Sequence, residues 1–326
     1  MYFGVEYDID PDRFIPITIL LDEVLYQSSV RNMREHYFQY HFQNTDWLLL
    51  SDYYFGNDKL NKVVTFTALP YVGNIEELQH TIQSVAPKDI KHTRNVNSEF
   101  VNLLHQLPIL NISFIFDRTI KYLIWKTQDE FLEDMSLYAQ ILNAYTAHWI
   151  ETEPHQKQRL TRLLKNIRYM QDCIQHKKKL PILCEVFFIS LLGGYVGSVL
   201  ARETMLENLL WMSDRDRSNE LGNNLIRELF QLTLINIIKH NIQFGFTSAN
   251  SSSDEWYQEL VRIPDYLTGT IANFDFKKGD HNLEKITIQK MLGLYFSENR
   301  ESSFIYRFHV IPEGLKIQRM LVGRNA

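Results

Sequence analysis

Three aspartates stand at positions that constrain both the fold and the chemistry of this 326-residue chain. Asp52 follows the apolar run 47–51, Asp214 follows the apolar run 209–213, and Asp265 opens a helical segment of small residues. A carboxylate directly after a buried strand emerges at the edge of a sheet, where burial without a partner is costly. Several such carboxylates repel one another unless a cation lies between them. The pattern therefore predicts a divalent-metal site suited to phosphoryl chemistry.

The order of the apolar and helical patterns predicts an α/β fold with a mixed sheet. The clearest unit is a hairpin, in which strands 47–55 and 62–69 flank the turn residues 56–61. We expect further strands at 14–20, 89–93, 109–116, 209–213, 242–246 and 304–311. We expect helices at 22–42, 74–85, 97–107, 128–150, 156–176, 182–206, 219–240, 254–273 and 284–296, with Pro264 starting a new helix or kinking the helix that contains it.

The same pattern suggests how the chain is organised. Residues 1–45 are expected to form a lead-in of a strand and a helix, residues 46–275 the main domain, and residues 276–326 a more polar C-terminal extension. The helices at 128–206 interrupt the strand pattern, so we expect them to form an inserted bundle. Its apolar stretch 186–200 contains three glycines and is shorter than a membrane span, which indicates a closely packed, buried helix.

Charge and cysteine content narrow the class of protein. The formal net charge is −5, so attraction to nucleic acid would have to come from local basic patches. The N-terminal residues lack the pattern of a signal peptide, and no membrane partner is expected. Cys173 and Cys184 lie in neither CxxC nor zinc-ligand spacing. We therefore expect two reduced thiols in a cytoplasmic protein.

Four short motifs follow one another along the chain. They are Ser51-Asp52-Tyr53, Ile90-Lys91-His92, Ser213-Asp214-Arg215-Asp216, and residues 262–269 from Arg262 to Gly269. In their order and type, residues 46–275 resemble the DUF3800 family of the ribonuclease H-like superfamily. The resemblance implies a ribonuclease H-like mixed sheet flanked by helices, with a helical insertion.

The resemblance also implies a mechanism, the two-metal hydrolysis of a phosphodiester. Asp52 would anchor one Mg²⁺ or Mn²⁺ ion, and Asp214 and Asp265 would complete the set of ligands. Asp216 and Asp117 are further candidate ligands. Lys91 would neutralise charge on the scissile phosphate, and His92 lies beside it in the sequence.

Two departures from the family pattern support a second interpretation. A Glu that follows the first Asp in the family is replaced here by Tyr53, and the Gln and Ala before the last Asp are Arg262 and Pro264. A catalytically inactive binding or assembly subunit of the same fold is therefore the alternative to a nuclease. Each aspartate also fits a structural role, because Asp is common in turns and at helix N-termini.

A basic helix is the candidate contact for a nucleic-acid backbone. Arg159, Arg162 and Lys165 recur at i, i+3 and i+6, so they share one side of the helix 156–176. The same pattern is typical of a solvated face opposite an apolar one. A third hypothesis for the whole chain is an interaction protein, with a protein partner or a second copy bound through the helical insert 128–206.

Overall fold

The first two strands form the predicted hairpin at the centre of the fold. The computed structural model describes residues 17–93, 95–214, 221–222, 224–238, 242–248, 257–276, 280–281 and 291–322. Strands β1 (Asp46–Tyr54) and β2 (Asn61–Pro70) pair antiparallel, with Asp52 opposite Thr65. β2 is buried along its whole length, as its β-branched and aromatic sequence predicts.

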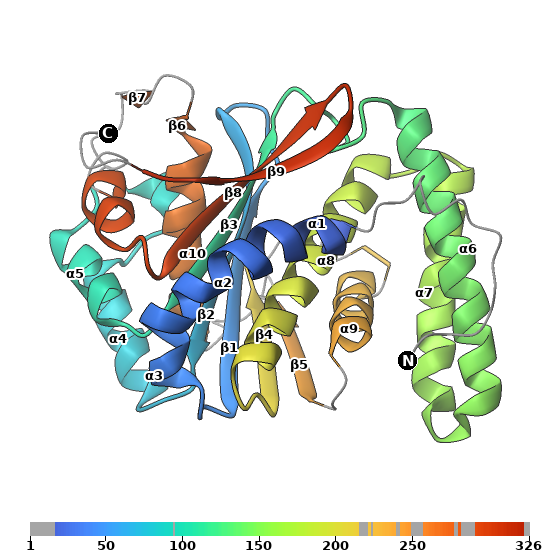
Figure 1. The fold of residues 1–326 in the computed structure, drawn as a ribbon, viewed down its shortest axis with the longest axis horizontal. Coiled ribbons are helices and arrows are strands. Elements are labelled where there is room, and N and C mark those ends of the chain that lie inside the picture. Colours follow the sequence, from blue (N-terminus) through green and yellow to red (C-terminus); the bar gives the residue numbers. More distant parts are fainter. Residues whose placement is uncertain are drawn as a thin grey trace.

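Five more strands extend this hairpin into one mixed sheet with the order β5-β4-β1-β2-β3-β8-β9 (Figure 1). β4 pairs parallel to β1, β5 parallel to β4, and β8 parallel to β3, whereas β2 and β9 run antiparallel to their neighbours. These strands are β3 (Leu110–Asp117), β4 (Asn208–Ser213), β5 (Gln243–Ser248), β8 (Ser303–Ile311) and β9 (Gly314–Met320). A separate short pair is formed by β6 (Phe274–Asp275) and β7 (Asp280–His281).

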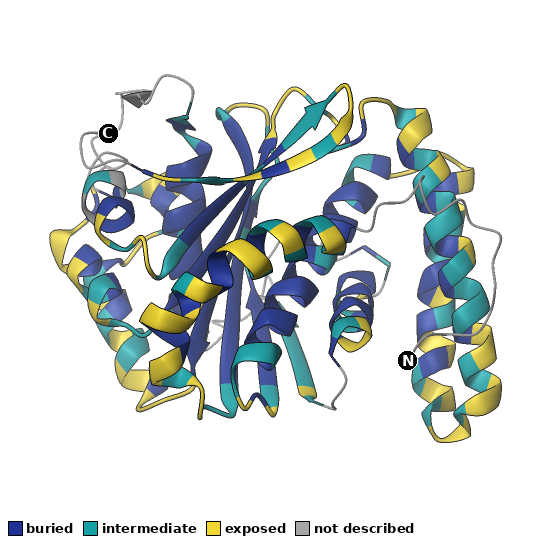
Figure 2. Ribbon diagram, viewed as in Figure 1, coloured by how far each residue is buried: buried dark blue, intermediate teal, exposed yellow. Residues whose placement is uncertain are grey.

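Helices cover both faces of the sheet and bury its strands, which Figure 2 shows as a dark central layer. The first face carries the N-terminal helical segment together with α8 and α9, and its apolar side chains form one core. The second face carries α4, α5, α10 and the short helix η5, which form a second core. The bounds on the first face are α1–α3 (Ile17–Leu21, Ser28–Met33 and Gln39–His41, joined by π-helical turns), α8 (Leu180–Glu203) and α9 (Leu225–Ile237). Those on the second are α4 (Ile75–Val85), α5 (Ser98–Gln106), α10 (Gln258–Ala272) and η5 (Met291–Phe296).

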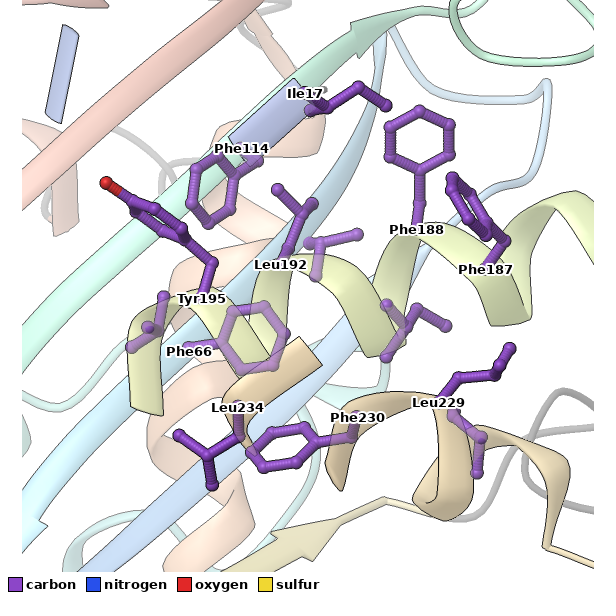
Figure 3. Packing of buried hydrophobic residues seen from close by; sticks show 14 of the residues in the cluster. Ile17, Phe66, Phe114, Phe187, Phe188, Leu192, Tyr195, Leu229, Phe230 and Leu234 are labelled. Carbon is purple, nitrogen blue, oxygen red and sulfur yellow. The ribbon is translucent and has the colours of Figure 1, made fainter. Parts of the chain in front are cut away.

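Helix α8 is the apolar centre of the first core. Figure 3 shows its Leu192 among the buried side chains of this core, with Phe66 and Phe114 of the sheet and Phe230 of α9. A Cβ atom added at Gly193 would lie 2.8 Å from the Phe230 ring, so the predicted close packing of this glycine-containing stretch is confirmed. Among the described residues α8 is also the one helix long and apolar enough to cross a membrane. However, 89% of its most apolar window is buried inside the protein, as in a core helix.

The helices expected to form one insert belong to two different parts of the structure. α6 (Gln128–Thr152) and α7 (Lys157–Gln175) form a helical hairpin at the right of Figure 1. α8, in contrast, packs on α9 and β2 and is part of the central core. The protruding helical hairpin is therefore shorter than the expected insert at 128–206. Both cysteines are unpaired and buried in this region, as expected.

Two local predictions are wrong, and one of the two alternatives at Pro264 is excluded. Residues 17–20, expected as part of a strand, begin a helical segment whose buried positions Ile17, Leu21 and Leu25 recur at helical spacing. Residues 90–92 form a 3₁₀ turn and not a strand, because only Ile90 of this turn needs to be buried. Helix α10 does not restart at Pro264 but contains it, since the turns on both sides are held in the second core.

The C-terminal residues add to the main sheet and do not form a separate layer. β8 pairs with β3 through the register Ile112 to Phe304 and Phe114 to Tyr306, and β9 follows as the edge strand. The strand predicted at 304–311 is therefore confirmed, and the described residues 291–322 of the expected C-terminal extension contribute to both cores.

Candidate active site

Two of the three aspartates are brought together by the parallel pairing of β1 and β4. Ser51 of β1 is the register partner of Ser213 of β4, and the Asp214 N–H donates to the Ser51 carbonyl at 3.4 Å. Asp52 and Asp214 follow these paired serines directly. Adjacent strands lie about 4.8 Å apart, so the parallel register places these two carboxylates side by side.

The alternation of side chains along the strands decides which face receives them. Leu50 and Met212 belong to the second core, between the sheet and α10. Asp52 follows Leu50 by two residues, and Asp214 follows Met212 by two residues. Side chains of a strand alternate between its faces, so residues two apart lie on the same face. Both carboxylates therefore emerge on the side of the sheet that α10 covers.

Helix α10 supplies the third aspartate, and hydrogen bonds join this helix to the 3₁₀ turn at 90–92 and to strand β1. The Ile90 N–H donates to Asp265 Oδ2 at 2.8 Å. The Thr268 hydroxyl donates to the Asp52 carbonyl at 3.3 Å. A Cβ atom at Gly269 would lie 2.6 Å from Ile90 Cγ2, so the absence of a side chain there allows the 3₁₀ turn to approach the helix.

These elements enclose a pocket of about 340 Å³ that contains all three predicted aspartates and Lys91. Four carboxylates and two lysines are among its lining side chains. The lining residues are Asp52, Tyr53, Tyr54, Asp58, Lys59, Ile90, Lys91, Asp214, Asp265, Thr268 and Gly269. Among the described lining residues, acidic groups therefore outnumber basic ones.

Burial and mutual repulsion make the carboxylates harder to ionise. Burial raises the pKa of Asp52 well above its usual value, and the charges of Asp265 and Asp214 raise it further. Burial also raises the pKa of Asp265 to about 6, although the Ile90 N–H favours the ionised form. Asp89 and Asp214 add repulsion at Asp265. The three acids thus interact electrostatically, which separate turn-capping groups would not do.

Lys91 is the cation on the 3₁₀ turn beside the acids. Its Nζ lies 3.2 Å from Asp89 Oδ2, and its side chain is 64% exposed. The hydrogen bond to Asp89 raises the pKa of Lys91, and the charges of Asp89, Asp214 and Asp265 act in the same direction. Lys91 therefore stays protonated at neutral pH and is accessible at the mouth of the pocket.

Sequence reasoning missed a second group of pocket residues, which comes from the end of the β1–β2 hairpin. Tyr54 donates a hydrogen bond to Asp58, and Lys59 Nζ lies 4.1 Å from the centroid of the Tyr54 ring. Two sequence signals could have identified them. Tyr54 is two residues from Asp52 and so shares its face, and Lys59 lies in the turn at the same end of the strand.

Of the two other predicted acidic ligands, the structure describes only Asp117. Asp117 is exposed at the end of β3, where its carboxylate accepts from the Thr119 N–H at 2.9 Å and the Thr119 hydroxyl at 2.7 Å. These hydrogen bonds fit the alternative interpretation of Asp117 as a turn residue. Asp117 does not line the pocket. Asp216 lies outside the described residues.

The predicted basic contacts lie elsewhere on the molecule. Helix α7, which carries Arg159, Arg162 and Lys165, packs on α6, α8 and α9, and α8 and α9 cover the first face of the sheet. Arg162 and Lys165 are exposed, whereas Arg159 is partly buried and burial lowers its pKa. The structure does not bring these three residues to the acidic pocket.

The pocket offers the donors of a metal site but not a finished coordination sphere. Within the described ranges, no group of three His, Cys, Asp or Glu side chains lies in metal-binding geometry. The charged metal-binding groups of the pocket are carboxylates, and none of the lining residues that the structure describes offers a sulfur or an imidazole ligand. Such oxygen donors fit hard cations such as Mg²⁺ and Mn²⁺.

Comparison of the chain with models of protein families, with curated proteins and with solved structures finds no match.

Proposed function

We propose that this chain is a metal-dependent hydrolase of phosphodiester bonds in nucleic acid, built on a ribonuclease H-like fold. The observation that carries the proposal is the meeting of Asp52, Asp214 and Asp265 in one pocket. These residues come from two strands and a helix that are distant in the sequence. Lys91 lines the same pocket and provides a cation beside the acids.

The strand arrangement supports the finer fold assignment. Five of the strands have the order β3-β2-β1-β4-β5, with only β2 antiparallel to the others. The hairpin and the later parallel strand that ends before an acid are two of the features on which the resemblance to the ribonuclease H-like fold is based. This strand order accounts for the acids of β1 and β4 being neighbours.

The charge of the pocket explains why the reaction would require a divalent cation. A phosphodiester is an anion, and four carboxylates against two lysines would repel it. Asp52, Asp214 and Asp265 are the residues that would hold Mg²⁺ or Mn²⁺. A bound ion supplies Lewis-acid stabilisation of the phosphoryl oxygens. It would also relieve the repulsion that raises the pKa of Asp52 and Asp265.

The chain's own cations and hydrogen bonds have separate tasks in this proposal. Lys59 of the β1–β2 turn and Lys91 of the 3₁₀ turn line the pocket and would contact the phosphate oxygens of the substrate. The Ile90 N–H holds Asp265, and Thr268 holds the backbone at Asp52. These bonds orient the two carboxylates before any ligand binds.

A binding subunit without catalysis is the second candidate, and one residue favours it. Tyr53 stands where the resembled family has a Glu, and its hydroxyl interacts with Ser51 and Ser213. It therefore supplies no additional carboxylate to the pocket. If the three aspartates do not suffice for catalysis, the pocket would bind a cation and nucleic acid without hydrolysis.

Thermal unfolding during a Mn²⁺ titration tests the cation site directly. A ligand present at 100 times its Kd stabilises the native state by about 2.7 kcal/mol. We expect this stabilisation for the wild type and for Asp117→Asn, and its loss for Asp52→Asn. Hydrolysis of labelled DNA and RNA by the same proteins then separates a nuclease from a binding subunit. Equal thermal stabilisation of Asp52→Asn and Asp117→Asn by Mn²⁺ would exclude the proposed site.

A further inference from the structure

A second hollow lies on the other side of the 3₁₀ turn from the acidic pocket. Its volume is about 520 Å³. The two hollows share their walls, because the turn presents Lys91 to the first and His92 to the second, and α10 presents Asp265 to the first and Tyr266 to the second. The residues that line it are Ser84, Val85, Pro87, Lys88, His92, Thr93, Asn95, Asn97 and Tyr266.

The chemistry of the second hollow is opposite to that of the first. None of its described lining residues is a carboxylate, and the basic side chains of Lys88 and His92 both lie on its wall. Hydroxyl and amide groups of Ser84, Thr93, Asn95 and other residues provide hydrogen-bond partners. This lining favours an anion with several oxygen atoms, whereas the acidic pocket needs a cation before it can accept one.

The wall between the hollows is held in place by α10. The Arg262 guanidinium donates to the Ala86 carbonyl at 2.9 Å, and the Tyr266 hydroxyl donates to the Lys88 carbonyl at 2.9 Å. The Thr93 hydroxyl lies 3.0 Å from the Tyr266 hydroxyl. Because α10 also carries Asp265, one helix sets the positions of both hollows, and the segment that carries Lys88 and His92 is ordered before a ligand arrives.

We propose that the second hollow binds a backbone phosphate of a single nucleic-acid strand, next to the phosphodiester that occupies the acidic pocket. The inference rests on the proposed function for the identity of the ligand. Lys88 and His92 would contact the phosphate oxygens, and the polar side chains would contact the adjoining sugar and phosphate groups. The basic face of α7 lies on the other side of the sheet and would not contact this strand.

Fluorescence anisotropy with a labelled single-stranded oligonucleotide tests the assignment. The measurement uses the wild-type protein with Mn²⁺ and an oligonucleotide whose phosphorothioate backbone resists hydrolysis, and compares it with the protein carrying Lys88→Gln and His92→Gln. A single-strand phosphate contact contributes a slope of about 0.7 to the salt dependence of binding, equivalent to about 5-fold in affinity at 0.1 M salt. We expect at least this loss, with a correspondingly shallower salt dependence.

The matched control is Arg162→Gln with Lys165→Gln, which removes two exposed basic side chains from α7. We expect this pair to leave the affinity unchanged. Loss of binding in the α7 pair alone, or equal affinity of all three proteins, would overturn the inference. Hydrolysis by the wild type together with no effect of Lys88 and His92 would refute only the second hollow. Binding that depends on Lys88 and His92 without any hydrolysis would refute only the proposed catalytic function.

Discussion

β1 and β3 each carry an aspartate near their C-terminal end, yet the two aspartates have different environments. Asp52 lies under α10, where burial and two neighbouring acids raise its pKa. Asp117 is exposed and hydrogen-bonded to Thr119 within its own turn. The pKa of an acid near a strand end is therefore raised only when a covering element removes water and brings further negative charges to it.

The largest predicted difference between these two positions concerns catalysis. We expect Asp52→Asn to lower kcat/KM for nucleic-acid hydrolysis by at least about 100-fold, because charge stabilisation by a bound metal is worth several kcal/mol. Asp117→Asn should change it less than about 2-fold, because that carboxylate touches no part of the pocket. Steady-state kinetics with Mn²⁺ measures both. A comparable loss at the two positions would remove the distinction between them.

The pH dependence of stability sharpens the same comparison. In the metal-free protein the pKa of Asp265 is raised from 3.8 to about 6. The native state therefore takes up a proton that the unfolded chain does not, and the stability gained is present at low pH and is lost as pH rises through 6. This contribution is at most about 3 kcal/mol. Urea unfolding between pH 4 and pH 7 measures it.

Asp265→Asn is the control for that measurement, because the Asn side-chain oxygen can still accept from the Ile90 N–H. We expect the variant to lose the part of the stability gain on acidification that comes from Asp265. Asp52, whose pKa is also raised, would account for the remainder. Wild-type stability that falls as pH is lowered from 7 to 5, equally in both proteins, would contradict the raised pKa.

A smaller effect is expected where α10 meets the 3₁₀ turn. Gly269→Ala places a Cβ atom against Ile90, and overpacking costs about 1–3 kcal/mol, partly offset by about 1 kcal/mol of improved helix propensity. Gly293→Ala is the control, since no atom lies within 4 Å of the added Cβ. In the Ile90→Ala background, Gly269→Ala should no longer destabilise the protein. Thermal unfolding of the wild type, the two single variants and the double variant measures this coupling. Additive effects of the Gly269 and Ile90 substitutions would show that this contact does not limit how closely the 3₁₀ turn approaches α10.

The smallest effect is expected at Asp117 itself. Asp117→Ala removes the acceptor of two hydrogen bonds to Thr119 at an exposed turn, which should cost about 1 kcal/mol. Asp117→Asn retains an acceptor and should be nearly neutral. Chemical denaturation measures both values. A pronounced loss of Mn²⁺ binding in either variant would instead assign Asp117 to the cation site.

The sequence predicted the parts of the site that follow from local periodicity. The hairpin of β1 and β2 and the strand β4 are confirmed, and Asp52, Asp214 and Asp265 lie in one pocket with Lys91. Tyr54 was missed although it follows Asp52 by two residues on the same strand, and Lys59 was missed because its position in a turn does not by itself distinguish a pocket wall from a solvated loop. The turn at 90–92 was predicted as a strand, since its short apolar signal does not reveal that Asp265 binds its backbone.

By itself the sequence determined which residues alternate and where strands end, because these patterns are set by short-range geometry and the burial of apolar side chains. Only the tertiary structure decided which aspartates share an environment. Asp52, Asp214 and Asp117 have similar local sequences, but the pairing of β1 with β4 and the position of α10 bring only the first two to Asp265. Long-range packing also places α8 in the central core, whereas α6 and α7 form a hairpin beside it, because burial depends on partners that are distant along the chain.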